Sequence, residues 1–131
     1  MAHAEGNSSN EQEQAELAAK IAEQNDRFRS TWGADFTVPG QIVLTRGVAD
    51  LSPAAKAIIM QRVQKFDTFC EENDPHGDHT FGAFDFEIGG NSYNLFWKID
   101  LYDTDYAMGS DDPSDVTVTR RVLTILHAHE W

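Results

Sequence analysis

One short polar segment carries the residue types that bind metal ions: Asp74, His76, Asp78 and His79. Carboxylate oxygens and imidazole nitrogens are ligands for Zn²⁺, Mn²⁺ and Fe²⁺. With Asp100 or Asp103 added, such a site would suit a small metal-dependent hydrolase. The same residues also suit an ordinary turn, in which an aspartate accepts a backbone N–H and the histidines face water. We expect the turn, with no metal and no cofactor, and we keep the hydrolase as the alternative.

A second group of carboxylates follows thirty residues later: Asp103, Asp105, Asp111, Asp112 and Asp115. Oxygen ligands of this kind hold Ca²⁺ or Mg²⁺. The calcium-loop template fails, however. Counted from Asp103, Met108 stands where the template requires glycine, and Ser114 stands where it requires glutamate. We therefore expect an exposed acidic turn.

Nucleophilic catalysis has no clear candidate in the sequence. Cys70 is the only cysteine, which excludes an internal disulfide and a cysteine-rich zinc site. It follows an apolar helical pattern and has no basic neighbour to activate it, so we expect a buried, inert thiol. No triad spacing and no glycine-rich phosphate loop is present. The motifs therefore favour a protein that is not an enzyme.

Acidic residues are concentrated in the middle of the chain. The 131 residues have a formal net charge of −12. Residues 67–115 hold thirteen acidic side chains and a single basic one, Lys98. This charge disfavours contact with nucleic-acid phosphates and with anionic membranes. A solvated surface that only maintains solubility is one explanation. An acidic docking surface for a basic partner is another.

We expect the protein to be localised in the cytoplasm. No apolar stretch is long enough to cross a membrane. The N-terminus lacks the basic start and apolar stretch of a secretory signal.

Hydropathy patterning predicts one domain over residues 11–131, after a disordered lead-in over residues 1–10. A first amphipathic helix is expected from Glu11 to about Phe28. A second should begin after the capping residue Ser52 and continue to Phe69 or Cys70. Its apolar stripe is predicted to consist of Ala57, Met60, Val63 and Phe66.

Segments rich in β-branched and aromatic residues predict four strands: 41–48, 80–88, 92–102 and 116–129. Gly89-Gly90-Asn91 should turn the chain between the middle two. The last segment also has helical spacing, so a helix there stays open. The fold class is then α+β, with two helices packed on one face of a small antiparallel sheet of about four strands. We expect Phe84, Phe86 and Phe96 to lie in its core.

Several segments of the chain resemble a known family when taken together: VLTRGV (43–48), FDTF (66–69) followed by ENDPHGDHTFGAF (72–84), FWKIDLYD (96–103), GSDDPSD (109–115) and RVLTIL (121–126). In this order they are similar to DUF3768, a family of bacterial proteins of unknown function found on alphaproteobacterial chromosomes and mobile elements. The resemblance spans roughly residues 25–131. The chain departs from the expected family pattern at His76 and Asp78. The resemblance implies a fold and a genomic setting, and it brings no activity.

These observations lead to one functional hypothesis. We expect a non-enzymatic interaction domain whose acidic surface binds a basic, nucleic-acid-binding surface of another protein. Its most specific form is a mobile-element inhibitor of a bacterial defence complex, such as a CRISPR effector or a restriction complex, that imitates nucleic acid. Neither direct nucleic-acid binding nor membrane binding is expected. The residues predicted to contact the partner are Glu71, Glu72, Asp74, Asp78, Asp103, Asp105, Asp111, Asp112 and Asp115.

Overall fold

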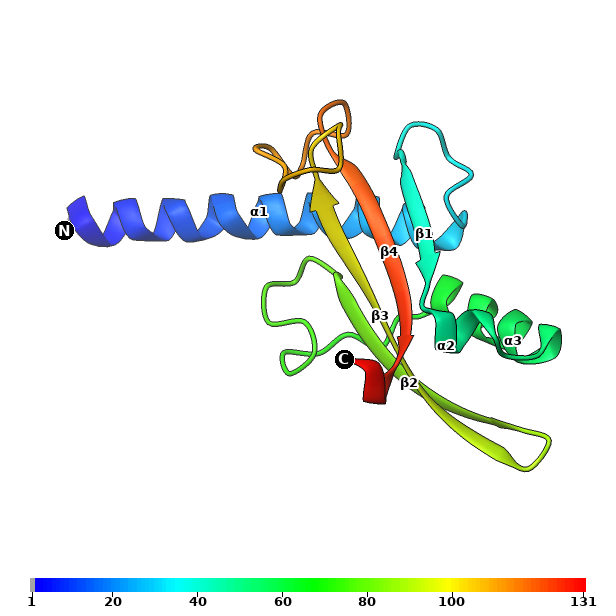
Figure 1. Ribbon diagram of the computed structural model, residues 1–131. Helices are drawn as coiled ribbons and strands as arrows, with labels where there is room; N and C mark the ends of the chain where they lie inside the picture. The colour runs from blue at the N-terminus through cyan, green and yellow to red at the C-terminus, as the bar shows by residue number, and fades with distance from the viewer. Residues whose placement is uncertain (1) are drawn as a thin grey trace.

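The computed structural model describes residues 2–131, with side chains from Asn10 onward. The described residues form three helices, a four-stranded sheet and a final 3-10 turn, arranged as in Figure 1. In chain order these are α1 (Ala2–Ser30), β1 (Gly40–Leu44), α2 (Arg46–Ala49), α3 (Pro53–Gln64), β2 (Phe81–Ile88), β3 (Asn91–Tyr102), β4 (Arg120–His127) and η1 (Ala128–Glu130). The expected α+β class is confirmed. The lead-in predicted over residues 1–10 falls almost wholly outside the described side chains and stays a prediction.

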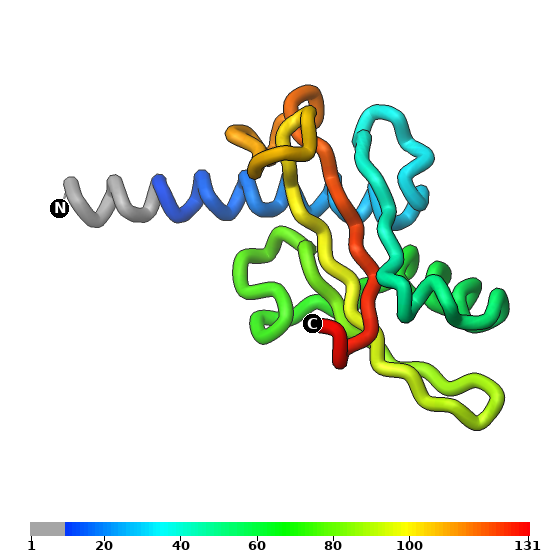
Figure 2. Tube along the Cα trace, in the orientation of Figure 1, coloured from blue at the N-terminus to red at the C-terminus, as the bar shows by residue number. Residues whose placement is uncertain are grey.

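The sheet is mixed rather than wholly antiparallel. Its strand order is β1-β4-β3-β2. The pairs β2–β3 and β3–β4 are antiparallel, whereas β1 runs parallel to β4. A tight hairpin would force antiparallel pairing, but β1 and β4 are separated by most of the chain, so either direction is open to them. The path of the chain in Figure 2 shows β1 joining the sheet beside the last strand.

The β2–β3 hairpin closes as predicted. Gly89 and Gly90 form a two-residue turn with φ of +58° and +80°. Two consecutive positive φ values match the twist of a hairpin, and glycine adopts them without steric cost. Asn91 is already the first residue of β3. The final segment is also a strand, but it begins only at Arg120.

The first strand is shorter than the sequence pattern predicts. It ends at Leu44, and residues 46–49 form the short helix α2. The Thr45 hydroxyl accepts the Val48 N–H at 3.4 Å and so caps this helix. The predicted strand over 41–48 is therefore wrong in its second half. A threonine can cap the helical turn that follows it as readily as it can extend a strand, so the residue type alone does not distinguish the two.

The second predicted helix, α3, begins as expected and ends early. Ser52 accepts the Ala55 N–H at 3.2 Å, and Pro53 occupies the first turn. The helix ends at Gln64, not at Phe69 or Cys70. Arg29 donates to the carbonyl oxygens of Val63 at 2.7 Å and Phe66 at 3.1 Å. In a longer helix these carbonyls would accept the N–H groups of later residues. Because Arg29 donates to them instead, they need no further helical turn.

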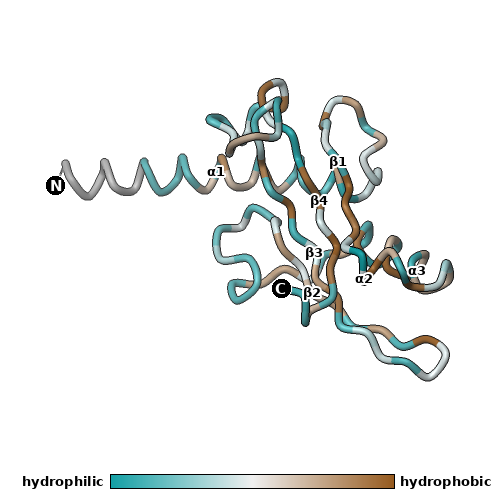
Figure 3. The backbone as a smooth tube through the Cα atoms, viewed as in Figure 1, coloured by the Kyte–Doolittle hydropathy of each residue, from teal (hydrophilic) through white to brown (hydrophobic). Residues whose placement is uncertain are grey.

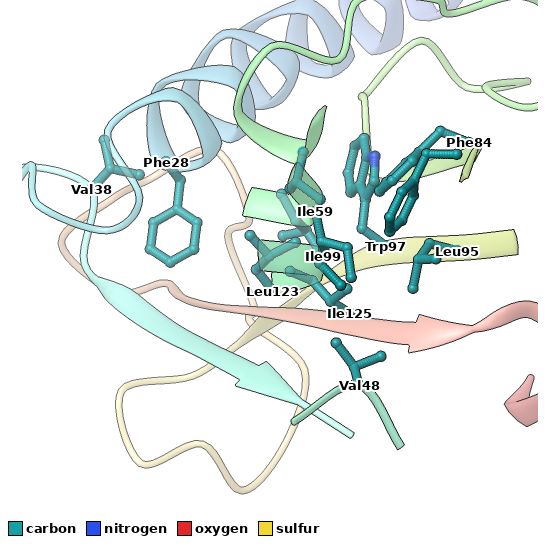
Figure 4. Close-up of a cluster of buried hydrophobic side chains, with 13 residues drawn as sticks. Phe28, Val38, Val48, Ile59, Phe84, Leu95, Trp97, Ile99, Leu123 and Ile125 are labelled. Carbon is teal, nitrogen blue, oxygen red and sulfur yellow. The ribbon is translucent and has the colours of Figure 1, made fainter. Parts of the chain in front are cut away.

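The predicted stripe of α3 is right at Val63 and Phe66 and wrong at Ala57 and Met60. Ala55, Ile59 and Val63 are buried, at intervals of four residues, whereas Ala57 and Met60 are exposed. Two apolar stripes run along this helix, and only tertiary packing selects one. Figure 4 shows Ile59 pointing toward Ile99 and Leu123 of the sheet.

The helices α1 and α3 cover one face of the sheet. The core there consists of Phe28, Val38, Val48, Ala55, Ile59, Val63, Phe84, Phe86, Leu95, Trp97, Ile99, Leu123 and Ile125. Phe96 does not belong to it, contrary to our expectation. Neighbouring strand residues point to opposite faces, so Phe96 lies on the other face, where it contacts Phe81 and Trp131. Figure 3 shows hydrophobic stretches along β1, β3 and β4 and a mostly hydrophilic loop before β2. Among the described residues, no helix is long and apolar enough to cross a membrane.

Candidate functional site

Two acidic loops flank the sheet in Figure 1, one beside the start of β2 and the other at the end of β3. We call residues 71–80 the first acidic loop and residues 103–115 the second acidic loop. The first precedes β2, and the second lies between β3 and β4. Both are tied to neighbouring positions of α1. How they are tied determines which carboxylates face solvent.

A buried arginine lies beneath both loops. Arg121, at the start of β4, has no exposed surface. Its Nε donates to Asn25 Oδ1 at 2.7 Å, and its Nη2 donates to Gln24 Oε1 at 2.8 Å. Among the described residues, no carboxylate pairs with it. Burial lowers the pKa of Arg121 to about 10, which still leaves the guanidinium charged at neutral pH.

The two amides held by Arg121 in turn hold the loops. Gln24 Nε2 donates to the Ser114 carbonyl of the second acidic loop at 2.8 Å. Asn25 Nδ2 donates to the Asp78 carbonyl of the first acidic loop, also at 2.8 Å. Because an amide side chain accepts at oxygen and donates at nitrogen, each one links Arg121 to one loop. A single buried cation therefore organises both acidic segments.

A second connection joins the first acidic loop to α1. His79 Nδ1 lies 2.9 Å from Asp26 Oδ1. The same carboxylate oxygen accepts from Arg29 Nη2 at 2.6 Å. The His79 ring stacks on Phe69, with 3.7 Å between centroids and 2° between planes. These contacts hold His79 in the left-handed backbone region, at φ 56°, which is unusual for a residue other than glycine.

Arg29 connects this corner with the core. Only 2% of its surface is exposed, and its guanidinium lies 4.6 Å from the Trp97 ring centroid. Burial lowers the pKa of Arg29, and the hydrogen bond and charge of Asp26 partly oppose that shift. Buried charges usually need such compensation. Arg29 therefore holds α1, the end of α3 and the first acidic loop together.

The predicted contact residues differ in their exposure. Five of the nine are exposed: Glu71, Glu72, Asp105, Asp111 and Asp112. Asp74 is turned inward, since its side chain is 7% exposed and its Oδ1 accepts the His79 N–H at 3.1 Å. Asp78 is partly buried and accepts from the Thr80 hydroxyl.

Two aspartates of the second acidic loop stabilise backbone turns. Asp103 Oδ1 accepts the N–H groups of Asp105 and Ala107, both at 3.1 Å. Asp115 Oδ1 accepts both the hydroxyl and the N–H of Thr117, at 2.6 and 2.9 Å. These hydrogen bonds lower the pKa of Asp115. The carboxylates that the structure leaves for a partner are therefore chiefly the five exposed ones.

The metal-binding alternative gains no support from the arrangement. His76 is exposed, and His79 is occupied by Asp26 and Phe69. Over residues 2–131 as described, no group of three or more His, Cys, Asp or Glu side chains is placed to hold a metal ion. Cys70 is exposed rather than buried, because α3 ends six residues before it.

The sequence analysis missed the residues that anchor the loops: Gln24, Asn25, Asp26, Arg29 and Arg121. One signal was present. In the segment RVLTIL, alternation places Arg121 on the same face as the core residues Leu123 and Ile125. A charged residue at an inward strand position indicates a buried polar network. The α1 partners carry no comparable signal, since polar residues surround them.

Comparison with known proteins identifies a family whose match includes both acidic loops and β4. No curated protein and no solved structure matches the chain. The model of one family, described as protein of unknown function (DUF3768), matches residues 44–130. This range contains both acidic loops and Arg121, and it leaves α1 outside. The match covers well over half of the sequence, so the chain belongs to the DUF3768 family.

Proposed function

We propose that this protein is a non-enzymatic interaction domain whose two acidic loops bind a basic, nucleic-acid-binding surface of another protein. Carboxylates held at fixed positions imitate the phosphates that such a surface normally binds. The most specific form of the proposal is an inhibitor of a bacterial defence complex, either a CRISPR effector or a restriction complex. Occupation of its nucleic-acid channel would then block its access to DNA or RNA.

The observation that carries the proposal is the anchoring of both loops on Arg121. Long-range attraction depends on the clustering of like charges on one side of a molecule. Affinity also depends on how much order is lost on binding, and a loop already fixed loses less. Hydrogen bonds at 2.8 Å to Ser114 and Asp78 fix one backbone point in each loop.

The one basic residue of the acidic segment does not reduce this charge at the loops. Lys98 lies on β3, and its Nζ is 3.0 Å from Asp100 Oδ2. That pair is therefore neutral as a unit and lies within the sheet. Neither loop contains a lysine or an arginine, as a surface that imitates phosphates requires.

Neutralisation of the exposed loop carboxylates tests the proposal. The loop variant combines Glu71→Gln, Glu72→Gln, Asp105→Asn, Asp111→Asn and Asp112→Asn, all at exposed positions. Purified CRISPR effector and restriction complexes serve as probes, with association followed by biolayer interferometry at several salt concentrations. We expect wild type to bind one of them and to block its DNA binding. The loop variant should associate about tenfold more slowly, with a flatter salt dependence.

A matched control removes the same charge elsewhere. Its substitutions are Glu11→Gln, Glu13→Gln, Glu16→Gln, Glu23→Gln and Asp50→Asn, also at exposed positions. If position matters, this control keeps most of the wild-type association rate. Equal losses in the two variants would indicate that only net charge acts. Absence of binding by wild type to both probes would refute the inhibitor form of the proposal.

A further inference from the structure

One phenylalanine lies almost wholly in solvent on a well-fixed turn. Phe36, between α1 and β1, is 94% exposed. Two hydrogen bonds to Asp35, the preceding residue, close the turn around it. Asp35 Oδ1 accepts the Thr37 N–H at 2.9 Å, and the Asp35 carbonyl accepts the Val38 N–H at 3.0 Å. The Asp35 carboxylate also lies 3.8 Å from Arg27 of α1. An exposed aromatic ring on a fixed turn is the form that interface anchors take.

The same chain has an open apolar pocket of about 170 Å³. It lies where the end of α1, β1, α2 and α3 meet, and its lining residues are Trp32, Leu44, Val48, Lys56, Ile59, Met60 and Ile125. A cavity of about 150 Å³ lined by apolar side chains binds benzene. The pocket is therefore the right size for one phenyl ring. Phe36 of the same molecule does not fill it, since that ring is exposed.

We propose that Phe36 of one copy of this chain inserts into the pocket of a second copy, and that the exchange is reciprocal. A twofold dimer uses the same surface on both subunits. This chain carries an anchor and a matching pocket on neighbouring elements, because Trp32 lines the pocket four residues before Phe36. Charge agrees with this pairing. Asp35 precedes the anchor, and Lys56 is the one charged residue that lines the pocket.

The negative charge of the chain does not prevent this contact. No residue of either acidic loop lines the pocket, whose lining comes from the end of α1, β1, α2, α3 and β4. Docking through the pocket therefore leaves the acidic loops out of the contact around the inserted ring. The remaining repulsion is screened by salt, so dimerisation should strengthen as salt is added. This inference is independent of the proposed function.

Sedimentation velocity over a range of protein concentrations tests the dimer. Wild type should change from monomer to dimer with rising concentration, and more readily at about 0.5 M salt than at 0.05 M. Phe36→Ser should raise the dissociation constant at least about tenfold. Met108→Ser is the matched control, because Met108 is also an exposed apolar residue, at 71%, but lies in the second acidic loop. A wild type that stays monomeric at every concentration, or a Phe36→Ser variant that dimerises normally, would overturn the proposal.

Complementation separates specific insertion from general adhesion. Met60→Glu places a charge at the pocket, and Met60 is 40% exposed, so the fold tolerates it. This variant alone should be monomeric. Mixed with Phe36→Ser, it should form a heterodimer, because one intact ring then meets one intact pocket. If the two variants stay monomeric when mixed, the reciprocal exchange is refuted.

Discussion

Arg121 shows how one side chain can determine the shape of a surface that it does not reach. It is buried without a carboxylate partner, and its hydrogen bonds end on two neutral amides. Burial of a charge is costly, so an apolar residue would fit this strand position better if packing were the only requirement. Its role is to orient Gln24 and Asn25, each of which binds one acidic loop.

Replacement of Arg121 by methionine should therefore loosen both loops. The side-chain oxygens of Gln24 and Asn25 would lose their hydrogen-bond donor inside the protein. This loss should lower the free energy of unfolding by about 1–3 kcal/mol. Amide hydrogen exchange should quicken in residues 71–80 and 103–115 more than in the strands. Arg46→Met removes the same charge from a side chain that is 96% exposed, and it should change neither quantity. Unchanged exchange in the loops of Arg121→Met would show that they are held by other contacts.

Among the helices, strands and loops, sequence patterns correctly predicted the features that depend on residues close together in the chain. The hairpin, the loops and the start of α3 depend on glycine pairs, acidic turns and the Ser52 cap, all of which lie within a few residues of the structure they form. The end of α3 depends on Arg29, which is distant in sequence. The parallel pairing of β1 with β4 and the anchoring of the acidic loops on Arg121 likewise depend on residues far apart in the chain. No local pattern contains them.

The β2–β3 pair makes a clear prediction about packing. Gly82 lies directly opposite Trp97 in the register. A Cβ at Gly82 would overlap the Trp97 indole. Gly82→Ala should thus cost about 1–3 kcal/mol of stability, measured by urea unfolding. Gly109→Ala is the control, since the nearest atom to its Cβ would be 4.0 Å away. Equal stability of the two variants would mean that the sheet shifts without penalty.

For the whole molecule, the charge excess sets a dependence of stability on salt. Twelve net negative charges repel one another in the folded state, and this repulsion is greatest at low ionic strength. The five exposed loop carboxylates contribute repulsion, and one of them, Asp112, also accepts a single hydrogen bond from the Ser114 hydroxyl at 3.1 Å. Asp103 and Asp115 each accept two hydrogen bonds that stabilise their turns.

Thermal melts should distinguish these two kinds of carboxylate. The loop variant with five neutral substitutions should melt a few degrees above wild type at low salt, and the gap should close at about 0.5 M salt. Asp115→Asn should instead melt below wild type at both salt concentrations, because it weakens the bonds to Thr117. A loop variant that is less stable than wild type at every salt concentration would mean that the exposed carboxylates are structural.

The three tryptophans give the protein built-in optical reporters. Trp97 is fully buried, Trp131 is 69% exposed, and Trp32 is partly buried at the apolar pocket. Indole fluorescence depends on contact with water, so a soluble quencher should reach Trp131 first and Trp97 only after unfolding. Trp32 should be protected from the quencher as copies associate. In a Trp131→Phe variant, the emission of Trp97 would report whether the core is intact. The emission of Trp32 would report whether the pocket is occupied.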